Sequence, residues 1–206
     1  MTAGVFVGCQ YVNTQGQTVQ AQYYPGNAAA SSAIAYVVVD ANAAFKVAVT
    51  NGSGAVSSTT VKAIGVNLAV DQTNTGSTTT GDSYAGVAVS ASATTSTPIT
   101  TSAAFRIVGV VPESAVTVTA NATSSSTTIT LSAANSAITP GMAVSGPGIT
   151  AGSNTYVTAV SSTTVTINTA VASAQATAAQ FSFTGYPEVL VAWNAGYHGY
   201  NNATGV

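Results

Sequence analysis

The feature that most limits the fold of this chain is a succession of short β-branched runs separated by glycine, asparagine and proline. Such runs, bounded by turn-forming residues, are typical of β-strands. No stretch shows the 3.6-residue period of an amphipathic helix. The sequence therefore predicts an all-β fold, with a β-sandwich or barrel-like parent domain. The runs expected to form strands are 5–12, 18–24, 34–39, 44–49, 61–70, 84–91, 104–111 and 188–193.

Two of these runs differ in how their apolar residues are spaced. Ala44–Val49 alternates, which indicates a strand that is buried on one face. Ile34–Val39 is apolar without interruption. A continuous apolar run is expected of a strand that is covered on both faces, so we expect Ile34–Val39 to be buried.

The middle of the chain has a different texture from its two ends. Residues 114–182 contain almost no aromatic side chain and no charged one. They also contain an approximate repeat, in which Ser125–Leu131 matches Ser161–Ile167, and each copy suggests a hairpin. We therefore expect 114–182 to be a small inserted β domain that projects from a parent domain made of 1–113 and 183–206.

Charge is almost absent from this chain. It has three basic and five acidic residues among 206, and its formal net charge is −2. A chain with no basic patch cannot neutralise phosphates, so we expect no nucleic-acid partner. No apolar run approaches the roughly 18 residues that suggest a membrane span, and no basic segment follows Met1 as a secretory signal would require. We expect neither a membrane partner nor a signal peptide.

The residues that usually carry chemistry are also scarce. His198 is the one histidine and Cys9 the one cysteine, which argues against an acid–base pair and against a zinc site. The polar run Asp71–Gly76 has oxygen-bearing side chains at alternate positions, but it lacks the terminal acid of a calcium loop. We expect no catalytic, cofactor-binding or metal-binding residues and no enzymatic activity. Cys9 is expected to be a small buried side chain.

The best site candidates are aromatic. Tyrosine and tryptophan are enriched at protein interfaces, and they also stack on sugars. For Trp193, packing in the core is an equal alternative, and His198 between two tyrosines suits a packing role as well. The interface candidates are Tyr23, Tyr24, Tyr186, Trp193, Tyr197, His198 and Tyr200.

The segments rich in aromatic residues resemble a family of small structural proteins of tailed bacteriophages, especially phages of aquatic bacteria. The family is encoded near the major capsid protein and decorates or cements the shell. The stretches that carry this resemblance are Val5–Tyr11, Tyr23–Gly26, Ala35–Asp40, Phe105–Val110, Tyr186–His198 and Tyr200–Val206. Within the middle segment, Gly141–Gly152 resembles a module that recurs in phage and bacterial surface proteins.

The resemblance implies a virion protein on the outer surface of an icosahedral capsid. Its partners would be the major capsid protein and copies of itself, for which a trimer is one arrangement. The alternative is a receptor- or glycan-binding module of a tail, fibre or adhesin, which would use the Ser/Thr/Asn-rich loops and the aromatic cluster. An enzyme is the third hypothesis, and the residue inventory argues against it.

Overall fold

The structure is a computed structural model, and it describes residues 4–24, 32–73, 76–77, 83, 85–88, 90–92, 95–98 and 103–194. Within these ranges the regular elements are β-strands and one short 3-10 helix, η1 (Val61–Ala63). The all-β prediction is confirmed. No helix among the described residues is long and apolar enough to cross a membrane.

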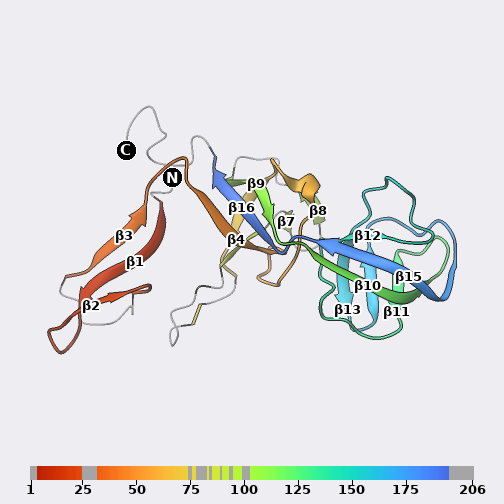
Figure 1. Cartoon of the computed structure of the whole chain (residues 1–206), viewed down its shortest axis with the longest axis horizontal. Coiled ribbons are helices and arrows are strands. Elements are labelled where there is room, and N and C mark those ends of the chain that lie inside the picture. Colours follow the sequence, from red (N-terminus) through yellow and green to blue (C-terminus); the bar gives the residue numbers. More distant parts are fainter. Residues whose placement is uncertain are drawn as a thin grey trace.

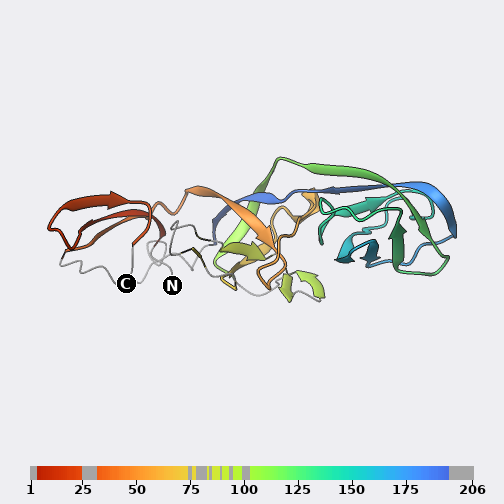
Figure 2. The ribbon, with the colours of Figure 1, turned by 90° about the horizontal axis from the view of Figure 1, so that it is seen from below.

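The strands form three units that lie in a row along the long axis of the molecule (Figure 1). Figure 2 shows the same row from below. At one end is a three-stranded sheet of order β2-β1-β3, made of β1 (Val5–Val12), β2 (Thr18–Ala21) and β3 (Ile34–Val38).

A closed barrel of order β16-β4-β6-β5-β9 occupies the centre. Its strands are β4 (Ala44–Thr50), β5 (Asn67–Asp71), β6 (Gly86–Ala88), β9 (Phe105–Val111) and β16 (Glu188–Trp193). A two-stranded ribbon is formed by β7 (Ser90–Ser92) and β8 (Thr95–Pro98). Side chains alternate along the barrel strands, so that Val189, Val191 and Trp193 of β16 point inward and Leu190 points outward.

At the other end is a six-stranded antiparallel sheet of order β12-β15-β10-β11-β14-β13. Its strands are β10 (Ser114–Ala122), β11 (Thr128–Leu131), β12 (Ala143–Ser145), β13 (Val157–Ser161), β14 (Thr164–Ile167) and β15 (Gln175–Gly185). The Val157 N–H donates to the Met142 carbonyl and the Gly141 N–H donates to the Val157 carbonyl, which links the two outer strands, so the sheet curls around its own core.

The sequence repeat forms the middle of this six-stranded sheet. Ser125–Leu131 and Ser161–Ile167 contribute β11 and β14, which pair antiparallel with Ile129 opposite Val165. Both of these side chains are fully buried. Each copy belongs to a hairpin, β10–β11 or β13–β14, as the repeat suggests.

The prediction of one strand over 61–70 was wrong in its first half. Val61–Ala63 forms η1, and the strand β5 begins only at Asn67. Gly65, with a φ of +91°, adopts the left-handed conformation between them. This conformation, which glycine tolerates best, turns the backbone away from the extended path between η1 and β5. The second strand is also shorter than expected, because β2 ends at Ala21.

A buried polar segment, Ser57–Thr59, joins the barrel to the six-stranded sheet. The Ser58 N–H donates to the Pro140 carbonyl at 2.8 Å, and the Thr59 and Tyr186 backbones exchange two hydrogen bonds. The Ser57 hydroxyl donates to the Pro140 carbonyl as well, at 2.7 Å. Since Ser57, Ser58 and Thr59 are at most 4% exposed, these bonds are shielded from water, and the two units are held together firmly. We call Ser57–Thr59 with its partners the junction.

The predicted domain boundaries can be tested by deletion. Ser114 and Gly185 are paired at the start of β10 and the end of β15, so the chain enters and leaves the six-stranded sheet at neighbouring points. Deleting 115–184 and joining the ends by a short linker should leave a folded barrel, because insertions with adjacent ends are tolerated. Its stability should fall, since the junction loses Pro140. Trp193 fluorescence during thermal unfolding measures this, and the absence of a cooperative transition would show that the barrel needs the six-stranded sheet to fold.

Candidate functional site

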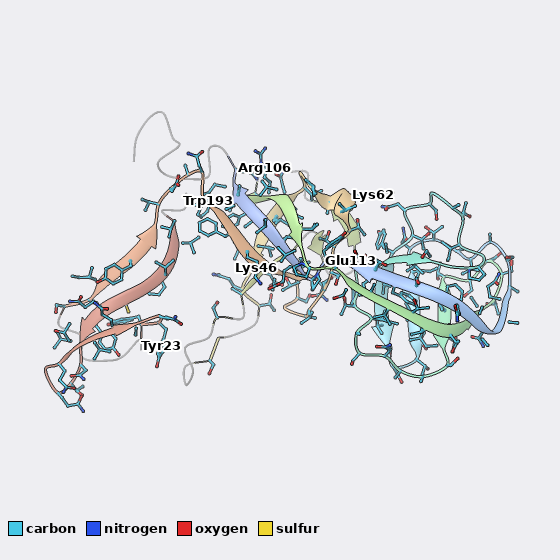
Figure 3. The ribbon with its side chains drawn as sticks, in the orientation of Figure 1. Tyr23, Lys46, Lys62, Arg106, Glu113 and Trp193 are labelled. Atoms are coloured by element: carbon cyan, nitrogen blue, oxygen red, sulfur yellow. The ribbon has the colours of Figure 1, made fainter. Side chains whose placement is uncertain are left out.

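The aromatic candidates do not come together in one site. Tyr23 and Tyr24 follow β2 of the three-stranded sheet, Tyr186 lies at the junction, and Trp193 ends β16 of the barrel. Figure 3 shows Tyr23 and Trp193 on separate units. Tyr197, His198 and Tyr200 lie outside the described residues.

Trp193 is part of the barrel core. It is 5% exposed, stacks on Phe105 with ring centroids 4.4 Å apart, and meets Phe45 edge to face at 5.9 Å. Edge-to-face and offset aromatic pairs stabilise a core beyond their burial alone. The structure thus gives Trp193 the core role that was its alternative in the sequence, and leaves no accessible ring for a partner.

Tyr186 and the Tyr23–Tyr24 pair take structural roles too, but they keep exposed surface. Tyr186 is half-buried, and its backbone completes the junction with Thr59. Tyr24 is 42% exposed and packs edge to face on Tyr11. The Tyr23 carbonyl lies 3.4 Å from the Cys9 sulfur, and Cys9 is buried as expected.

The surface that stands out is the three-stranded sheet itself. Four of the five side chains of β3 are exposed, so the prediction that Ile34–Val39 is buried on both faces was wrong for the single chain. The reason is that the two hydrophobic cores form inside the barrel and inside the six-stranded sheet, and neither includes a residue of β3. The exposed apolar side chains of this unit, which we call the apolar sheet, are Phe6, Val7, Tyr24, Ile34, Tyr36, Val37 and Val39.

Both faces of the apolar sheet carry these side chains. Phe6 lies opposite Val37 in the pairing of β1 with β3, and both are on one face. Ile34 and Tyr36 alternate with Val37 along β3 and lie on the other face, where the Tyr36 hydroxyl donates to the Gln10 amide oxygen. Sequence reasoning singled out Tyr23 and Tyr24 but missed these residues. The signal was present in the uninterrupted apolar run of β3.

Charge is confined to the central part of the chain. Every charged residue lies in 40–113 or at Glu188, so the apolar sheet and the six-stranded sheet have none. Figure 3 shows Lys46, Lys62, Arg106 and Glu113 around the barrel. Lys46 and Glu188 pair across neighbouring barrel strands at 2.9 Å, but both are exposed, and such pairs contribute little stability. No group of three metal-ligating side chains occurs among the described residues.

Asp71 is the one buried carboxylate in the described part of the chain, and it serves the fold. It accepts hydrogen bonds from the Gly54 N–H at 2.9 Å, from the Thr73 N–H at 3.0 Å and from the hydroxyls of Thr50 and Thr73. Burial raises the pKa of the Asp71 carboxyl, but the hydrogen bonds from Thr50, Thr73 and Gly54 outweigh burial and hold that pKa well below its usual range. Asp71 therefore ties two loops to the end of β5.

The six-stranded sheet carries an open hollow of about 420 Å3. Its lining includes the side chains of Asn121, Thr128, Thr130 and Gln175, and it contains neither a charged nor an aromatic residue. Amides and hydroxyls of this kind can bind neutral, hydroxyl-rich ligands, although no ring is present on which a sugar could stack.

Comparisons with protein-family models, with curated proteins and with solved structures found no match to this chain.

Proposed function

We propose that this protein is a structural component of a bacteriophage virion, which decorates or cements the outer surface of an icosahedral head. Its partners are the major capsid protein and further copies of the same chain, and it has no catalytic role. The observation that carries this proposal is the apolar sheet, which exposes apolar side chains on both faces in the single chain.

Exposed apolar strands favour assembly over an independent existence. Monomeric proteins rarely expose large contiguous apolar patches, and such patches mark interaction sites. Sheet edges are usually protected by lysine or proline, yet β1, β2 and β3 contain neither. In an assembled shell, neighbouring subunits can cover the apolar patch and pair with the unprotected sheet edges. A protein that stays in such a shell can therefore keep both features.

A receptor- or glycan-binding module is the second candidate, and the hollow on the six-stranded sheet favours it. The hollow offers neutral hydrogen-bonding groups, and its lining residues come from the end of β10, from β11 and its preceding turn, and from the start of β15. The two functions differ in what they require of that hollow. Glycan binding would be lost on changing Asn121 and Thr130 to alanine, whereas a decorating role would be unaffected.

The proposal predicts that the chain is found in purified particles of the phage that encodes it and stays there at high salt. Screening weakens contacts between exposed charges, and this chain has few of them. Raising salt from about 0.05 to 0.5 M should change the occupancy by less than about a tenth, measured by quantitative mass spectrometry of washed particles. Absence from the particles would rule out the proposal. Release by moderate salt alone would show that charge, not apolar burial, holds the protein.

A further inference from the structure

We infer that two copies of this chain associate through the outer edge of β3, so that their apolar sheets join into one continuous sheet. In the described part of the chain, the order β2-β1-β3 leaves β3 paired on one side only. An unpaired strand edge is a template for a further strand.

The distribution of side chains selects β3 rather than β2 as the edge that is used. Ile34, Tyr36 and Val37 of β3 are 56%, 43% and 39% exposed. Phe6 and Val7, at 44% and 53%, lie on the part of β1 that runs beside β3. On the opposite edge, the exposed positions of β2 are Thr18 and Gln20, which water solvates well. Apart from Tyr24, which follows β2, the exposed apolar side chains of the unit therefore lie on β3, directly after it or on the part of β1 beside it.

A second copy of the same chain fits this edge in charge and in backbone hydrogen bonding. β1, β2 and β3 carry no charged residue, so an identical sheet can approach without repulsion and without burying an unpaired charge. Pairing along β3 buries the flanks of the apolar side chains near this edge and not the two faces of the sheet, so the contact is smaller than the roughly 800 Å2 that each partner contributes to a standard interface. In such a strand addition, the main-chain hydrogen bonds between the two edges supply much of the affinity.

The pairing is isologous, which means that β3 of one copy lies antiparallel to β3 of the other about a twofold axis. Side chains on each face of β3 then lie beside their counterparts and shield one another's flanks, whereas the two faces of the joined sheet stay open to further neighbours. The apolar run of Ile34–Val39 therefore marks a surface for association and not a strand buried within one chain.

The mass of the purified full-length chain in solution tests this inference, by light scattering over a concentration series up to about 100 µM. The wild-type chain should have twice the single-chain mass of 20.2 kDa. Ile34→Lys places a charge at the edge and should raise the dissociation constant at least about 30-fold. Gln20→Lys on β2 is the matched control and should remain dimeric. Val37→Lys repeats the test on the other face of β3.

Hydrogen exchange of the wild-type chain gives a measurement that needs no variant. The amides of Ile34–Val38 that point away from β1 should be protected in the dimer and lose this protection on dilution, whereas those that point toward β1 should keep theirs. A single-chain mass at every concentration, a trimer, or a dimer that survives both lysine substitutions would overturn the inference. A dimer in solution from a protein that is missing from particles would instead contradict the proposed function and leave the β3 pairing intact.

Discussion

Gly141→Ala should lower the free energy of unfolding by about 2–5 kcal/mol. This substitution and Asp71→Ala have the largest effects that we expect from single changes. Gly141 has a φ of +87°, and a Cβ placed on it would lie 1.6 Å from the Ser58 carbonyl oxygen. That oxygen belongs to the junction, whose backbone cannot move without breaking the hydrogen bond from Ser58 to Pro140. The substitution therefore combines left-handed strain with a clash against a fixed backbone. Chemical denaturation measures the loss.

Gly152→Ala is the matched control for this substitution. Gly152 has a similar φ of +78°, but nothing lies within 4 Å of its Cβ position. Only the conformational strain remains, so the expected loss is about 1 kcal/mol. Equal losses in the two variants would show that the contact between Gly141 and Ser58 is not present in solution, and that the junction is looser than described.

Asp71→Ala should destabilise the barrel by about 3 kcal/mol or more, since it removes the carboxylate that accepts from the buried Gly54 N–H and the buried Thr50 hydroxyl. The N–H groups of Gly54 and Thr73 both donate to this carboxylate, and so does the buried Thr50 hydroxyl. Asp40→Ala is the control, because Asp40 is exposed and accepts one loop hydrogen bond, from the Asn42 N–H. Its loss should not exceed about 1 kcal/mol. A cost for Asp71→Ala no larger than for Asp40→Ala would contradict the role given to Asp71.

The same carboxylate predicts how stability depends on pH. The pKa of Asp71 is lower in the folded chain than in the unfolded one, so the unfolded chain binds the proton first as the pH falls. Its contribution to stability is complete above about pH 4 and is lost progressively below that value. The free energy of unfolding of the wild-type chain should therefore decline below pH 4, and this decline should be shallower in Asp71→Asn. An unchanged slope would assign the acid sensitivity to other carboxylates.

The local sequence pattern predicted most of the strands, because β-branched residues form each of them and turn residues bound it. β4 and β16 are examples. The pattern failed at Val61–Ala63, because Gly65 has a positive φ and the spacing of apolar residues does not reveal such a turn of the backbone. It also could not anticipate the junction, since nothing in the local sequence of Ser57–Thr59 indicates that Pro140 and Tyr186 will bond to this segment. At the junction the deciding contacts join residues far apart in the sequence.

The aromatic candidates show a similar limit. Composition identifies tryptophan and tyrosine as anchors, but it cannot tell a core ring from an interface ring. Trp193 went to the barrel core, whereas Phe6, Ile34 and Tyr36, which composition did not select, form the exposed surface. The apolar run of β3 led to a prediction of burial that is wrong for the single chain, because periodicity does not reveal whether any other part of the chain covers a strand.

The central claim, that the protein sits on the outside of a phage head, is tested most directly by imaging labelled particles. The turn around Gly16 is a suitable place for a small tag, because nothing lies within 4 Å of the Gly16 Cβ position. Electron microscopy of tagged particles, subtracted from untagged ones, should show the label at regular positions over the outer surface of the icosahedral head. A label confined to the tail or its fibres, or particles that carry no label at all, would contradict the account.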